Sequence, residues 1–152
     1  MNIEFNIPNL KLVFDITILI KLCLSTCIGL LIGRERKSQD KSGGARTMAM
    51  ISIGACMLGL LTIEIANRIA PETHNYTRLI AYGLPGIGFL GSGLIIKNRN
   101  KILGLTTAST LLALMPINYC IGLGFYSLGI LGAIFAYIIL EAKYKEFFRR
   151  NK

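Results

Sequence analysis

The 152-residue sequence has few side chains of the kinds that carry chemistry. It contains one histidine, no tryptophan and only 8 acidic residues. We find no paired nucleophile and base, no cluster of metal ligands and no phosphate-binding loop. The sequence therefore predicts a protein that is not an enzyme and holds no cofactor. The lone histidine, His74, falls in a polar loop, where a solvated imidazole is expected rather than a metal ligand.

The 4 cysteines all fall in apolar stretches. Cys23 and Cys27 are four residues apart and share one face of a helix, which would suit a soft metal ion. No histidine or second thiol pair stands near them, and a buried cysteine behaves as a small hydrophobic residue. We therefore expect no metal site.

Apolar residues make up 53% of the chain and the mean hydropathy is +0.55, more apolar surface than a soluble domain of this length can bury. Most of the five apolar stretches have about 20 residues, enough for a helix to cross a hydrocarbon core of about 30 Å. The sequence predicts an all-α, polytopic integral membrane protein with about five transmembrane helices. The predicted spans are residues 13–32, 47–66, 79–96, 102–117 and 120–140. The fourth is short and polar, so a re-entrant hairpin with the fifth is the alternative.

Lys and Arg are concentrated in residues 34–46, 97–101 and 141–152, between and after alternate spans. Cytoplasmic loops collect such charge. We therefore expect the segment 1–12 to lie outside, the domain 13–140 to cross the membrane, and the basic tail 141–152 to be cytoplasmic. The segment 1–12 has no basic region before the apolar run, so we expect the first span to be retained rather than cleaved.

The net charge of +9 lies mostly beside these membrane ends. Anionic lipid at the cytoplasmic face is the expected partner. No aromatic or glycine-rich binding module accompanies the cations, so nucleic acid is not expected.

Three ionisable residues fall inside or at the edge of predicted spans: Asp15, Lys21 and Glu64. Charges there are expensive and usually face protein or water. By helical rise, Asp15 and Glu64 lie at similar depths near the outer surface and Lys21 about two turns deeper. Lys21 could snorkel to either carboxylate and lock the first two spans together. A cation or proton pathway is the alternative.

The third stretch contains GLPGIGFLGSG, with small residues at Gly86, Gly88, Gly91 and Ser92. The glycine spacing is that of a dinucleotide-binding loop, but the strand, helix and acidic residue that such a loop needs are missing. Two interpretations stay open. The small residues form a face on which another helix packs closely, or Pro85 and the glycines break the helix and free carbonyls to line a cavity.

The fourth stretch opens with hydroxyl-bearing residues, which form a polar contact surface or bond back to carbonyls of their own helix. They are Thr106, Thr107, Ser109 and Thr110.

Basic residues also flank the first loop, in Arg34-Glu35-Arg36 and Arg46-Thr47. We expect Glu35 to hold Arg46 across the loop. Arg34 and Arg36 suit the negative end of a helix dipole without any ligand. Arg46 beside the start of a helix could also bind an anion.

Four of these motifs, in order, resemble those of the MgtC/SapB family of bacterial inner-membrane proteins. They are GLLIGRER at residues 29–36, GART at 44–47, GIGFLGSG at 86–93 and GLTTA at 104–108. The resemblance covers about residues 12–140. It implies a membrane domain of about five helices and a short member without the soluble C-terminal domain of one virulence-associated branch.

The resemblance also implies a link to magnesium homeostasis and growth at low magnesium. Members are often described as magnesium transporters, whereas one branch is proposed to restrain the membrane ATP synthase. The chain departs from the family at Pro85, where a small residue is usual, at Thr106, where that branch has asparagine, and at Leu112, where many members have tryptophan. Roles tied to these positions are not carried over.

Two functions follow as hypotheses. The chain is a non-enzymatic regulator that binds another membrane complex through Gly88, Gly91 and Ser92, or it is an ion transporter or transport accessory. A shortage of carboxylates at the membrane midplane argues against carriage of magnesium. Small-residue faces also suit packing between copies, so a homo-oligomer is a further expectation.

Overall fold

The computed structural model describes residues 16–68, 78–98 and 101–149. It is built from five helices and one short hairpin. The helices are α1 (Ile16–Ser38), α2 (Ala45–Arg68), α3 (Arg78–Gly93), α4 (Leu105–Leu123) and α5 (Tyr126–Arg149). Strands β1 (Ile96–Asn98) and β2 (Lys101–Leu103) pair antiparallel between α3 and α4. The predicted all-α class is confirmed, with the hairpin as an addition.

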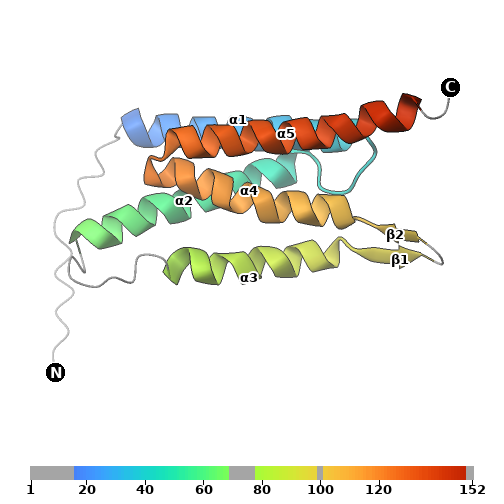
Figure 1. The fold of residues 1–152 in the computed structure, drawn as a ribbon. Helices are drawn as coiled ribbons and strands as arrows, with labels where there is room; N and C mark the ends of the chain where they lie inside the picture. The colour runs from blue at the N-terminus through green and yellow to red at the C-terminus, as the bar shows by residue number, and fades with distance from the viewer. Residues whose placement is uncertain (1–15, 69–77, 99–100, 150–152) are drawn as a thin grey trace.

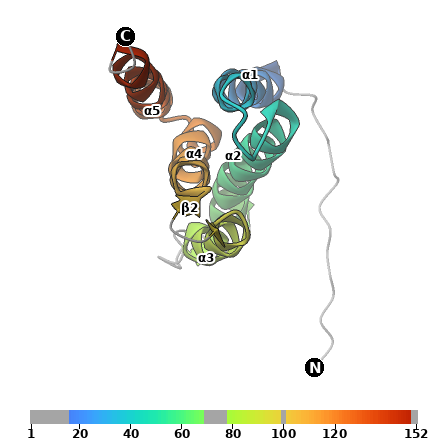
Figure 2. The same ribbon diagram turned by 90° about the vertical axis from the view of Figure 1, so that its right-hand side faces the viewer.

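The five helices run alternately along the long direction of the molecule (Figure 1). In the end-on view of Figure 2, α4 lies centrally, α3 at one edge, and α1 and α5 toward the opposite edge. The first loop, the hairpin and the C-terminal end of α5 all lie at one end of the bundle (Figure 1). The described parts of the three cation-rich regions therefore lie at the same end.

Glycines set the closest helix crossings. A Cβ on Gly29 would lie 2.6 Å from Ser52 Oγ, and one on Gly33 would lie 2.4 Å from Ala45 Cα, so α1 and α2 approach along a GxxxG face. A Cβ on Gly122 would lie 2.2 Å from the Cys56 carbonyl oxygen. The absence of side chains at these glycines lets α2 contact both α1 and α4 through backbone.

The outside of the bundle is apolar. Large hydrophobic side chains such as Leu19 on α1, Met50 on α2 and Ile139 on α5 are at least half exposed. Three helices are long and apolar enough to cross a membrane, namely Ile16–Ser38, Ala45–Ala66 and Leu105–Leu123. This pattern is that of a membrane protein, in which exposed apolar residues contact lipid rather than water.

The last two helices begin and end elsewhere than predicted. The predicted spans 102–117 and 120–140 place a turn at residues 118–119, but α4 continues through Pro116 to Leu123 and the turn falls at Gly124 and Phe125. Gly124 has φ of 91° and donates its N–H to the Ile121 carbonyl, a typical glycine-terminated helix end. Proline is tolerated inside membrane helices because neighbouring groups satisfy the freed carbonyl.

The end of the third predicted span and the start of the fourth belong to the hairpin rather than to helices. Ile96 and residues 102–103 belong to the strands, and α4 starts only after Gly104. Gly104 has φ of 84°, and a Cβ there would lie 1.8 Å from the Leu94 carbonyl oxygen. Only glycine allows the chain to return this closely on α3.

Candidate functional site

A hydrogen-bonded cluster of uncharged polar residues lies in the centre of the bundle. Ser25 of α1 donates its hydroxyl to the Ser52 carbonyl at 2.6 Å and contacts Asn118 Oδ1 at 2.8 Å. Asn118 of α4 donates to Ser52 Oγ at 3.1 Å and to the Leu114 carbonyl at 2.8 Å. All three side chains are fully buried. The cluster joins α1, α2 and α4 and leaves no donor of the Asn118 amide group unpaired.

We expect Asn118→Ala to destabilise the bundle by about 1–3 kcal/mol, because the partners of a buried amide lose their hydrogen bonds. The measurement is the detergent concentration that unfolds the protein in mixed micelles. Ser109→Ala is the matched control, since Ser109 lies on the same helix, is exposed and bonds only to the Leu105 carbonyl. Equal midpoints for the two variants would contradict a stabilising role for the cluster.

Lys21 is buried and reaches the end of α4. Its Nζ donates to the Gly122 carbonyl at 2.9 Å and lies 6.0 Å from the centroid of the Tyr126 ring. A cation at a helix C-terminus stabilises the last carbonyls and the dipole. Lys21 thus ties α1 to α4, whereas the sequence analysis expected a carboxylate partner. Asp15 lies outside the described residues, and Glu64 is an exposed residue of α2 with a partner of its own.

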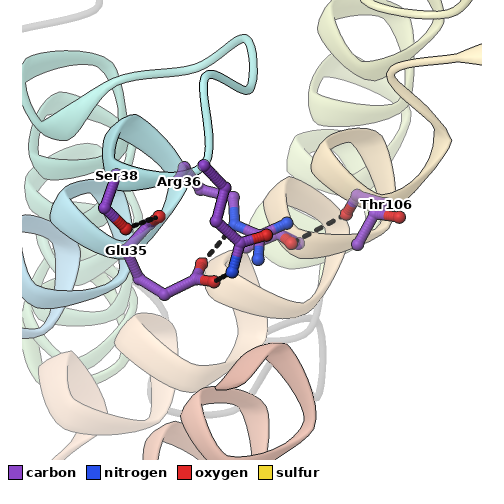
Figure 3. Close-up of polar contacts among 6 residues, drawn as sticks. Glu35, Arg36, Ser38 and Thr106 are labelled. Carbon is purple, nitrogen blue, oxygen red and sulfur yellow. Dashed lines mark hydrogen bonds and ion pairs between the residues drawn. The ribbon is translucent and has the colours of Figure 1, made fainter. Parts of the chain in front are cut away.

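A buried ion pair lies in the last turns of α1, just before the first loop, at the cationic end of the bundle. The Arg36 guanidinium donates from Nε to Glu35, and Gln39 donates to the other carboxylate oxygen of Glu35. Only 2% of the Arg36 side chain and 8% of the Glu35 side chain are exposed. Figure 3 shows Arg36 directed from α1 toward the part of α4 that carries Thr106. The pair therefore lies where α1 meets the start of α4.

The predicted tie between Glu35 and Arg46 is wrong, because Arg36 and Gln39 occupy both carboxylate oxygens of Glu35. Arg46 and Thr47 are exposed in the first turn of α2, and Arg34 is exposed on α1. The structure brings none of these three into a common site within the described residues.

The hydroxyls at the start of α4 bond mainly within their own helix. Ser109 donates to the Leu105 carbonyl at 3.0 Å and Thr110 to the Thr106 carbonyl at 2.7 Å. Thr107 is 1% exposed, and its hydroxyl has no hydrogen-bond partner among the described residues. The back-bonding interpretation therefore holds for Ser109 and Thr110.

The small residues Gly86, Gly88, Gly91 and Ser92 of α3 differ in what they contact. Gly91 is buried, and a Cβ there would lie 3.5 Å from Ala108 of α4. Gly86 and Gly88 have no atom within 4 Å of a Cβ position, and the Ser92 hydroxyl donates to the Phe89 carbonyl of its own helix. The helix runs unbroken through Pro85. Of these four residues only Gly91 serves packing within the described part of the chain, so the predicted partner contact through Gly88, Gly91 and Ser92 loses Gly91 to α4.

The buried cluster of Ser25, Ser52 and Asn118 was not predicted from the sequence, and Arg36 was expected only to interact with the helix dipole. Asn118 fell in the predicted turn, so its place inside a helix was not considered. Polar residues recurring within otherwise apolar spans are a signal that could have found all three, because such residues usually face protein.

Comparison with known proteins identifies relatives over most of the chain. The model of the MgtC family matches residues 22–147. SapB of Bacillus subtilis is 33% identical over 132 residues, 84% of this chain and 56% of SapB. YhiD of Escherichia coli K12, named a putative magnesium transporter, is 31% identical over 134 residues, 86% of this chain and 62% of YhiD.

MgtC of Salmonella typhimurium is 33% identical over 106 residues, 70% of this chain and 43% of MgtC. The chain spans about half the length of the curated relatives it matches. No solved structure matches the chain.

Proposed function

Because the chain belongs to the MgtC family, we propose that it acts in magnesium homeostasis as a non-enzymatic regulator of another complex in the bacterial inner membrane. It crosses that membrane five times, with its N-terminus outside and its C-terminus in the cytoplasm. The gathering of cation-rich regions at one end of the bundle supports this orientation (Figure 1). The name of YhiD supports the link to magnesium.

The observation that carries the proposal is the outer face of α3. Gly86 and Gly93 share one face of the helix with nothing within 4 Å of a Cβ position, and Phe89 on that face is 79% exposed. Gly88 is also open but lies on a different side of the helix. A face of small residues lets a second helix approach closely. Helix α3 lies at the edge of the bundle (Figure 2), and no atom of the described residues lies against the Cβ positions of this face. It is therefore suited to a membrane helix of a partner.

The interior of the bundle supports regulation over carriage of magnesium. Within the part that the structure describes, the Glu35 carboxylate is buried only at the cationic end and is paired with Arg36. The other buried polar residues are cationic or uncharged: Lys21, Ser25, Arg36, Ser52, Thr62, Thr107, Thr110 and Asn118. Magnesium prefers carboxylate oxygens, and a fixed cation such as Lys21 repels it. A path for a divalent ion would have to pass these side chains.

The test is a photo-cross-linking amino acid at Phe89, with the same probe at Phe135 as control, because Phe135 is exposed on α5. We expect a cross-linked membrane protein with the probe at Phe89 only. We expect Gly86→Leu to abolish both the product and growth at low magnesium, since the added side chain blocks close approach.

Two results would contradict the proposal. One is magnesium flux into sealed vesicles that contain only this protein, which would establish a transporter. The other is a cross-linked product of two copies of the chain and nothing else, which would make the α3 face an oligomer contact.

A further inference from the structure

The hairpin of β1 and β2 extends from the cationic end of the bundle, beyond the ends of α3 and α4 (Figure 1). All six residues of its two strands are exposed. A two-stranded hairpin that packs on nothing is marginally stable at best in water. The hairpin is therefore suited to contact something outside this chain, and it is separate from the α3 face.

The length of α3 sets the depth of the hairpin in the membrane. From Arg78 at its outer end, the 16 residues of the helix rise by about 24 Å. This is about 6 Å less than a hydrocarbon core of about 30 Å. About two residues of extended chain cover the remaining distance, and residues 94–96 after the helix are all apolar. The hydrocarbon core therefore ends near Ile96, the first residue of β1.

The polarity of the hairpin changes in the same direction along its length. The pair of residues nearest the bundle, Ile96 and Leu103, is apolar and about half exposed. The next pair contains Lys97, and the outermost pair, Asn98 and Lys101, contains no apolar side chain. The base of the hairpin thus fits the edge of the hydrocarbon, and its outer part fits the headgroup region.

The backbone limits how deeply the hairpin can lie. Among the described residues each strand pairs only with the other, so the outer edge of each strand presents N–H and C=O groups without a strand partner. Open strand edges do not occur in the hydrocarbon region, whereas water and headgroups can satisfy them at the interface. The hairpin therefore lies at the membrane surface, with only its base in contact with acyl chains.

The hairpin is cationic. Neither Lys97 nor Lys101 forms an ion pair with a described residue, and the sequence from residue 94 to residue 105 contains no acidic residue. Figure 2 shows the hairpin beside α3 and α4, whereas α5, which carries acidic residues near its end, lies toward the opposite edge of the bundle. Basic residues at a membrane surface attract anionic headgroups.

The size of this surface favours lipid over a protein partner. A typical protein interface uses about 20–30 residues on each side, whereas the two strands offer six. An apolar base followed by a cationic outer part instead matches the order of acyl chains and headgroups in one leaflet.

We propose that the hairpin binds anionic phospholipids at the membrane surface. Ile96 and Leu103 contact the upper part of the acyl chains, and Lys97 and Lys101 bind the phosphates of the headgroups. The hairpin joins α3 to α4, so this contact fixes the depth of both helices in the bilayer.

The test uses Ile102→Trp, because the chain has no tryptophan and Ile102 is an exposed residue of β2. The full chain is reconstituted into vesicles of phosphatidylcholine with a minor share of phosphatidylglycerol. One lipid at a time carries bromine on the upper part of its acyl chains and quenches the tryptophan nearby. We expect phosphatidylglycerol to be enriched about fivefold around the probe, the fold-change that corresponds to about 1 kcal/mol for one basic residue. Phe89→Trp, on α3, should be quenched by each lipid according to its share.

Two further variants test the lysines. Lys97→Gln/Lys101→Gln should abolish the enrichment, while brominated phosphatidylcholine still quenches Ile102→Trp and so reports that the hairpin stays at the membrane. Lys37→Gln/Lys41→Gln is the matched control, because both lysines are exposed at the same end of the bundle. This control should keep the enrichment.

Three outcomes would overturn the proposal. Quenching of Ile102→Trp by neither brominated lipid would place the hairpin in water. Quenching in proportion to the share of each lipid would show no preference for anionic headgroups. Equal loss of enrichment in the two double variants would assign the preference to the general charge of this end of the bundle. None of these outcomes bears on the α3 face, so the regulatory function can fail or stand independently.

Discussion

Replacing Gly59 by leucine is expected to destabilise the bundle by about 3 kcal/mol or more, because the crossing of α2 and α4 has no room for a side chain. A Cβ on Gly59 would lie 2.5 Å from the Tyr119 carbonyl oxygen and 2.9 Å from Gly122 Cα. Both neighbours are backbone atoms, so no rotamer change relieves the clash. The two helices would have to move apart.

The measurement is maleimide labelling of Cys56, which is fully buried beside this crossing, with the other three cysteines replaced by alanine. A loss of about 3 kcal/mol corresponds to labelling about a hundredfold faster. Gly54→Leu is the matched control, since Gly54 lies on the same helix and has nothing within 4 Å of a Cβ position. Equal labelling rates in the two variants would show that the crossing is not tightly packed.

Glycines show which helix contacts could be predicted from the sequence and which could not. Gly29 and Gly33 have the GxxxG spacing of a helix contact and could have been identified from sequence. Gly59 and Gly122 stand singly in different helices, so only the fold shows that they face each other. The glycines of α3 are the most conspicuous in the sequence. Of those from Gly86 to Gly93, however, only Gly91 lies within 4 Å of another described element.

Composition and charge were sufficient for the class of protein, because apolar length and the positions of cations follow directly from the membrane environment. They were not sufficient to predict the hydrogen-bond partners of the buried polar groups. The position of Lys21 inside an apolar span follows from the sequence, but its acceptor on Gly122 depends on where α4 ends. The predicted fourth span ends at residue 117, whereas α4 continues to Leu123 and ends at Gly124.

Arg36→Met is expected to destabilise the cationic end of the bundle by about 3 kcal/mol, because it leaves the buried Glu35 carboxylate without a counter-charge. Gln39 keeps one hydrogen bond to Glu35 but no positive charge. The thermal midpoint of the protein in detergent measures the loss, and Lys37→Met, at an exposed position on the same turn, should leave it unchanged. In the double variant Glu35→Gln/Arg36→Met no charge is left unpaired, so most of the stability should return. A double variant as unstable as Arg36→Met would instead assign the effect to packing of the arginine stem against α4.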